Sequence, residues 1–142
     1  MALINEEKIL ELAALSVEEK TAQARCDYDS IIQSMESKGT QTAQEVRESI
    51  DILAATVVFG NYAFSQTERD FLENTIDLKK DDAYKLQHEC EEYFYDAATV
   101  FRTNLSEQER EKVAEIMVLL ATVDGHISKK ELRWLRKILH VI

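Results

Sequence analysis

Apolar residues recur along this 142-residue chain mostly at steps of three and four, which is the spacing of an amphipathic helix. The stretches 52–59 and 116–123 are instead apolar nearly all round, as helices buried on most sides are. We therefore expect these two stretches to be central. The clearest one-sided stripe predicts a face directed at the core, and it consists of Ala83, Leu86, Cys90, Tyr93, Phe94, Ala97, Phe101 and Leu105.

Helix starts are marked by a Ser or Thr followed three residues later by Glu, the pattern of a capping box. There is no proline and there are only three glycines, so few positions interrupt regular structure. These features predict an all-α fold. The five capping pairs are Ser16/Glu19, Thr42/Glu45, Ser65/Glu68, Ser106/Glu109 and Ser128/Glu131. The predicted helices span about 5–14, 17–38, 43–58, 66–78, 82–104, 107–123 and 129–140.

The two apolar stretches begin two similar segments, which indicates an internal duplication. ILAATV is followed after a loop by SQTERDFL, and MVLLATV is followed by SKKELRWL. We expect one domain over 1–142, with about seven helices and two pseudo-repeated helix hairpins around a long central helix at 82–104. Residues 1–42 are more polar and are expected to form a peripheral helical layer, whereas 43–142 form the duplicated core.

Charge narrows the possible partners. The net charge of −10 argues against general nucleic-acid binding. No apolar run approaches the ~20 residues of a membrane span, and acidic residues occupy the start, so a cytoplasmic protein is expected. A concentration of cations near the C-terminus is interpreted first as favourable for the helix dipole, and alternatively as a surface that docks on an acidic protein partner. These cations are Lys129, Lys130, Arg133, Arg136 and Lys137.

Catalytic chemistry is poorly represented in the sequence. Cys26 and Cys90 lack the spacing of a zinc or redox motif, and no Gly-rich phosphate loop or nucleophile elbow occurs. His88 and Glu92, four positions apart, could lie on one helical face as ligands of a small hydrolase, but no further ligands are identifiable. We predict that the chain is not an enzyme and has no obligatory cofactor.

The segment EIMVLLATVDGHISKKELRWLRKIL resembles the tellurite-resistance TerB family, which has an Asp-Gly loop between an apolar helix and a capped one. The resemblance is clearest over 114–140 and extends over 43–142, because the family has a similar duplication and about seven helices. In the first repeat, Gly60 and Asn61 stand where an acidic residue is expected. The matching residues are Ala121, Asp124, Gly125, Ile127, Ser128 and Glu131.

The resemblance implies a stress-response scaffold or a metal-associated module. Our main hypothesis is a non-enzymatic helical interaction module with a protein partner, in a bacterial stress response. The alternative is a domain that binds Ca²⁺ or Mg²⁺, in which Asp124, Glu131 and Glu68 of the repeat partner converge. The loop lacks the acids at alternate positions of an EF-hand. We therefore interpret Asp124 mainly as a turn residue and Glu131 as a capping residue.

Overall fold

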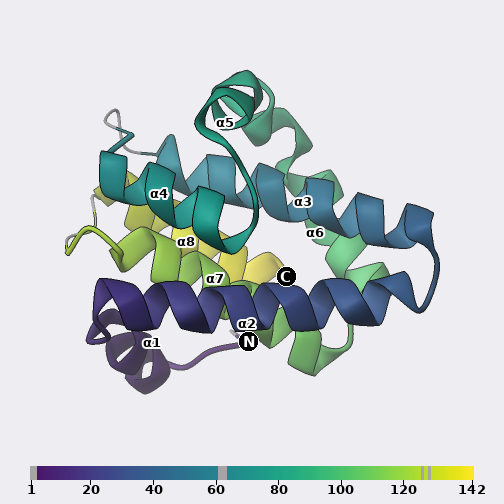
Figure 1. Ribbon diagram of the computed structural model, residues 1–142, viewed down its shortest axis with the longest axis horizontal. Coiled ribbons are helices and arrows are strands. Elements are labelled where there is room, and N and C mark those ends of the chain that lie inside the picture. Colours follow the sequence, from purple (N-terminus) through teal and green to yellow (C-terminus); the bar gives the residue numbers. More distant parts are fainter. Residues whose placement is uncertain (1–2, 61–63, 126, 128) are drawn as a thin grey trace.

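The computed structural model describes residues 3–60, 64–125, 127 and 129–142, except for the side chains of Lys130 and Trp134. Within these ranges the chain forms helices and connecting turns, with no strand. In Figure 1, α2 crosses the front of the molecule with α7 and α8 behind it. The helices are α1 (Glu6–Ala13), α2 (Val17–Glu36), α3 (Thr40–Val58), α4 (Gln66–Thr75), α5 (Lys80–Leu86), α6 (Cys90–Asn104), α7 (Glu107–Thr122) and α8 (Lys129–Val141).

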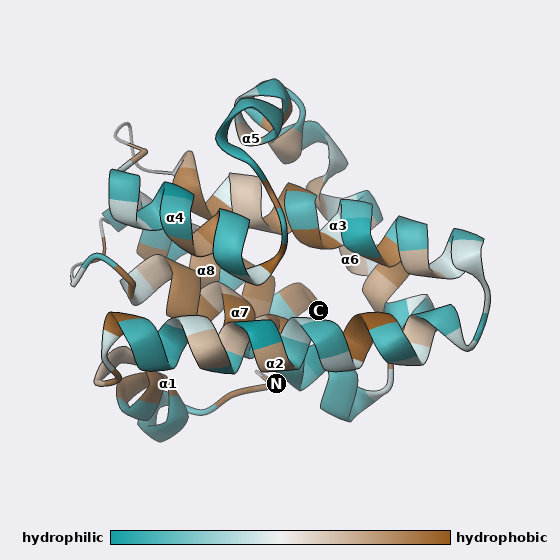
Figure 2. Ribbon diagram, in the orientation of Figure 1, coloured by the Kyte–Doolittle hydropathy of each residue, from teal (hydrophilic) through white to brown (hydrophobic). Residues whose placement is uncertain are grey.

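The all-α prediction is confirmed, and α3 and α7 are the central helices as expected. Every residue from Leu53 to Val58 and from Ile116 to Ala121 is buried. Because a helix has 3.6 residues per turn, such an unbroken run covers its whole circumference. α2, α6 and α8 all contact α3, and α1, α2 and α8 contact α7. Figure 2 shows apolar residues on the inner sides of these helices and polar residues outside.

Three of the predicted capping boxes are present. Ser16, Ser65 and Ser106 each accept a hydrogen bond from the backbone N–H three residues on, and the Glu there accepts from the serine N–H. The prediction at Thr42 is wrong, because α3 already begins at Thr40. Gly39, with φ of 136°, allows the sharp turn from α2 into α3. The predicted box at Ser128 lies outside the described residues.

The long helix predicted over 82–104 is divided into α5 and α6. Between them, the backbone N–H groups of Gln87 and Glu89 donate to the carbonyls three residues before, those of Tyr84 and Leu86. Such bonds tighten the backbone and interrupt the α-helical ladder. Both halves still pack on α3, which brings Leu86 and the α6 stripe to the same helix. The count of about seven is therefore close to the eight helices of the described chain.

α1 and α2 pack on the core through a mixture of apolar and charged side chains. α2 buries Tyr28, Ile31 and Met35 against neighbouring helices. It also buries Asp27, which is only 4% exposed at the contact between α2 and α7. Burying a charge without compensation is costly, so the protonation state of this side chain affects how firmly α2 is held.

The Asp27 carboxyl group lies beside the carboxyl group of Glu115 on α7. Burial raises the pKa of Asp27 to about 8, and hydrogen bonding with Glu115 and the charge of Glu115 act in the same direction. Gln23 Nε2, which donates to Asp27 Oδ1 at 3.1 Å, and the charge of Lys112 oppose this rise. The Asp27 carboxyl group therefore retains its proton near neutral pH.

Replacing Asp27 with Asn should reduce the pH dependence of stability. A folded-state pKa of about 8, raised from 3.8, means that folding retains a proton, so stability falls as pH rises through this interval. Between pH 5 and 9 the unmodified protein should lose on the order of 3 kcal/mol more than the Asp27→Asn variant. Urea unfolding at a series of pH values measures this difference.

A Glu18→Gln variant is the matched control, because Glu18 is exposed on the same helix. It should keep the pH profile of the unmodified protein. Parallel profiles for the unmodified and Asp27→Asn proteins would contradict a proton retained on Asp27 at the α2–α7 contact.

Candidate functional site

Glu68, Asp124 and Glu131, here termed the carboxylate cluster, converge at one end of the molecule. Glu68 is in the first turn of α4 and Glu131 is in the first turn of α8, and both are fully buried. Asp124 follows the C-cap of α7, next to Gly125, whose φ is 87°. The charges of Glu131 and Asp124 both raise the pKa of Glu68, which places the three groups within electrostatic reach. The structure thus brings together the residues that the cation hypothesis grouped.

Capping chemistry explains why Glu68 points inward. Its Oε1 accepts from the backbone N–H of Ser65 at 3.0 Å, and its own N–H donates to Ser65 Oγ at 3.1 Å. Burial raises its pKa to about 7, against the lowering effect of the Ser65 hydrogen bonds. The charges of Glu131 and Asp124 add to the rise. The cluster therefore carries a carboxyl group that is part-protonated at neutral pH.

Lys20 on α2 supplies a cation close to this cluster, which the sequence did not predict. Its side chain is buried, and its Nζ donates to the backbone carbonyl of Thr122 at 2.7 Å. Burial lowers the pKa of Lys20, and the nearby charge of Asp124 opposes that effect. Lys20 and Thr122 are 102 positions apart in the sequence, so no local pattern in the sequence indicates their contact. The docking of α2 on α7 brings the two residues together.

Carboxylate oxygens are the ligands that Ca²⁺ and Mg²⁺ prefer. One Glu68 oxygen already accepts the capping hydrogen bond, and the Lys20 ammonium group is close to Asp124. Among the described residues, no three His, Cys, Asp or Glu side chains lie together as a set of metal ligands. Cation binding by Asp124, Glu131 and Glu68 therefore stays a prediction.

The predicted partner-binding cations lie on α8, which is strongly amphipathic. Leu135, Ile138 and Leu139 on its inner side are buried. Lys129, Arg133 and Arg136 are exposed. They are four and three positions apart, so they share one face of the helix.

Lys137 is held closer to the protein surface than these three cations. It is half-buried, with its Nζ 4.9 Å from the ring centroid of Tyr95 and 5.3 Å from that of Phe94. This distance allows a cation–π interaction. The side chain of Lys130 lies outside the described set. Most of the predicted basic surface is therefore presented outward.

The geometry assumed for His88 and Glu92 is wrong. His88 is exposed in the turn between α5 and α6, whereas Glu92 is in the first turn of α6. Because the helix is interrupted between them, their spacing of four does not place them on one continuous helical face. The observation that suggested a His-carboxylate ligand pair is thereby removed.

Asp124 is expected to act mainly through the turn, and an Asp124→Asn variant tests this. Asn preserves the local hydrogen bonding of a turn but removes the charge. The variant should lose less than about 1 kcal/mol of stability. Millimolar Ca²⁺ or Mg²⁺ should leave the thermal melting curves of both proteins unchanged. A ligand specific for the folded state raises its stability, so a gain of several degrees in the unmodified protein alone would favour cation binding.

None of the helices in the described ranges is long and apolar enough to cross a membrane.

Comparison with known proteins identifies the family. No curated protein and no solved structure matches the chain. The sequence does match the family described as tellurite resistance protein TerB, over residues 39–142. This match covers both α3 and α7 and the carboxylate cluster between the repeats. The chain therefore belongs to the TerB family.

Proposed function

We propose that this chain is a non-enzymatic interaction module that binds an acidic protein partner through the outer face of α8. The module acts in the cytoplasm, as part of a bacterial stress response of the tellurite-resistance type. The stress-response context is supported by membership of the TerB family. The interaction role is supported by the surface itself.

The observation that carries the proposal is the alignment of Lys129, Arg133 and Arg136 on one exposed face of a helix whose other face is buried. The whole chain carries a net charge of −10, so this basic face differs in sign from the protein as a whole. Complementary charge accelerates encounter with a partner and fixes its orientation. An acidic partner surface is therefore the chemistry that fits α8.

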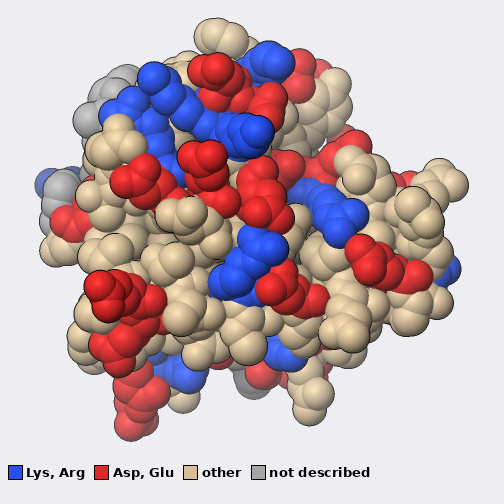
Figure 3. Space-filling model, in the orientation of Figure 1, with Lys and Arg blue, Asp and Glu red and all other residues tan. Residues whose placement is uncertain are grey.

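The face seen in Figure 3 is different, because acidic and basic side chains alternate on it. Several Arg side chains of the protein are paired with Asp or Glu. Arg25 Nη1 lies 2.7 Å from Asp77 Oδ1, and Arg47 Nη2 lies 3.0 Å from Glu36 Oε1. Exposed pairs of this kind contribute little stability, but they cancel charge locally. A surface of this composition offers no dominant sign to a charged partner.

Reversing the charge of the α8 face should abolish partner binding. The variant Lys129→Glu/Arg133→Glu/Arg136→Glu replaces three exposed cations and leaves the buried side of α8 intact. The tagged protein, expressed in the source cell, should recover a specific partner by affinity capture. The variant should lose that partner while its circular dichroism spectrum and melting temperature stay near those of the unmodified protein.

The control is Lys79→Glu/Lys80→Glu/Lys85→Glu, which makes the same charge change at exposed positions in and beside α5. This variant should retain the partner. Equal loss in both variants would show a dependence on total charge, and retention by the α8 variant would exclude α8 as the binding surface.

A further inference from the structure

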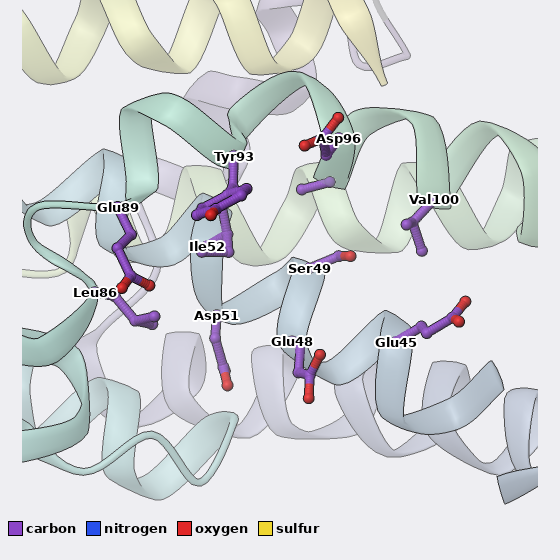
Figure 4. A pocket seen from close by; sticks show the side chains of 11 residues that line it. Glu45, Glu48, Ser49, Asp51, Ile52, Leu86, Glu89, Tyr93, Asp96 and Val100 are labelled. Carbon is purple, nitrogen blue, oxygen red and sulfur yellow. The ribbon is translucent and has the colours of Figure 1, made fainter. Parts of the chain in front are cut away.

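A groove of about 480 Å³ runs between α3 and α6, away from the carboxylate cluster. Its volume is within the range of about 300–1,000 Å³ found for ligand sites. Figure 4 shows Glu45 and Val100 at one end, and Leu86 and Glu89 at the other. α3 and α6 thus run in opposite directions along it. The groove lies beside the half of α3 that precedes its fully buried stretch.

The two walls of the groove have the spacing of a helix-binding surface. α3 contributes Glu45, Glu48, Ser49 and Ile52, at positions i, i+3, i+4 and i+7. α6 contributes Tyr93, Asp96, Ala97 and Val100, at the same spacing. Each wall therefore presents one stripe about 10 Å long, since a helix rises 1.5 Å per residue. A third helix laid between two such stripes meets side chains of both along two turns.

The floor of the groove is largely apolar and includes one hydroxyl group. Ile52, Leu86 and Val100 are half-buried and Tyr93 is 44% exposed, so apolar surface remains open to solvent. Ser49 is only 6% exposed, and its side chain projects from α3 into the groove (Figure 4). Its hydroxyl group can hydrogen-bond with a ligand in the groove.

The rim of the groove is acidic. Glu45, Glu48, Asp51, Glu89 and Asp96 line it, and none of the described lining residues is Lys or Arg. Burial raises the pKa of Asp51 to about 7, and the charges of Glu48, Asp82 and Asp77 raise it further. Negative charge beside exposed apolar surface attracts a ligand that is both cationic and apolar.

We propose that the groove between α3 and α6 binds a basic amphipathic helix of a protein partner. Apolar residues at i, i+3, i+4 and i+7 of that helix lie on Ile52, Leu86, Val100 and the Tyr93 ring. Its flanking Lys or Arg side chains reach the rim carboxylates. This is the helix-in-groove mode of peptide recognition. The groove is distinct from the basic face of α8. It selects a basic partner, whereas the α8 face selects an acidic one, so this proposal does not depend on the function proposed for α8.

The test uses a synthetic peptide of roughly four helical turns, with Leu on one face and Lys on the other. A matched peptide carries Glu in place of Lys. Titration of the ¹⁵N-labelled full chain should shift the amide signals of residues 45–52 and 93–100 with the Lys peptide and leave them unchanged with the Glu peptide. Absence of binding by the Lys peptide, or shifts confined to other helices, would overturn the proposal.

Two variants locate the binding. Glu48→Lys/Asp96→Lys reverses charge at the rim, and Val100→Trp fills the groove without a change of charge. Each should weaken binding of the Lys peptide at least about tenfold, because binding requires both charge complementarity and open apolar surface. Glu11→Lys/Glu73→Lys makes the same charge change at exposed sites elsewhere and should bind like the unmodified protein. An equal loss of affinity for the Lys peptide in this control would show that binding depends on total charge alone, and would overturn the proposed site.

Discussion

The fold depends on the burial of two helices, α3 and α7, around their whole circumference. Neither can face water along its apolar stretch, so the remaining helices are arranged to cover them. Each large aliphatic side chain removed from water contributes roughly 1.5–3 kcal/mol, and both helices contain several in succession. The covering helices need only one apolar face each, and α8 shows this most clearly, because its inner side is aliphatic and its outer side cationic.

Where the outer helices cover α3 and α7 completely, they also bury some of their own charged groups. The positions of the carboxylate cluster and of the groove between α3 and α6 follow from how complete this cover is. The carboxylate cluster forms because α4 and α8 begin with inward-pointing acids, while α2 brings Lys20 to the end of α7. The groove forms where the cover of α3 by other helices is incomplete. Its residues on α3 precede Leu53, the first residue of the fully buried stretch, and α6 leaves part of their surface open to solvent. One constraint thus yields both a closed polar cluster and an open acidic groove.

Local sequence signals predicted most of the fold but little of the surface geometry. The capping pairs at Ser16, Ser65 and Ser106 identified helix starts because capping acts within four residues. The break between α5 and α6 was missed, since the apolar stripe continues through it. The internal repeat was sufficient to group Glu68 with Glu131, because the two residues occupy equivalent positions in the two sequence repeats. Lys20 and Asp27 could not be predicted, because their burial depends on how α2 docks against α7.

Tyr93 illustrates the same limit at the groove. Its position in the apolar stripe indicated a core residue, yet it is 44% exposed and lines the groove. An apolar stripe in the sequence defines one face of a helix. The neighbouring helices determine which part of that face is buried. The apolar stripe of α6 is wider than the surface that α3 covers, and the uncovered part becomes a wall of the groove.

Native-state hydrogen exchange tests the central role of α3 and α7 most directly, because it reports the free energy of opening for each backbone amide. Amides of residues 53–58 and 116–121 should exchange only through global unfolding, with a common free energy that decreases with denaturant at the global slope. Amides of α1 and α5 should exchange through local opening at lower free energies. Exchange of the α3 or α7 amides at a lower free energy than those of α2 or α6 would contradict a fold organised around these two buried helices.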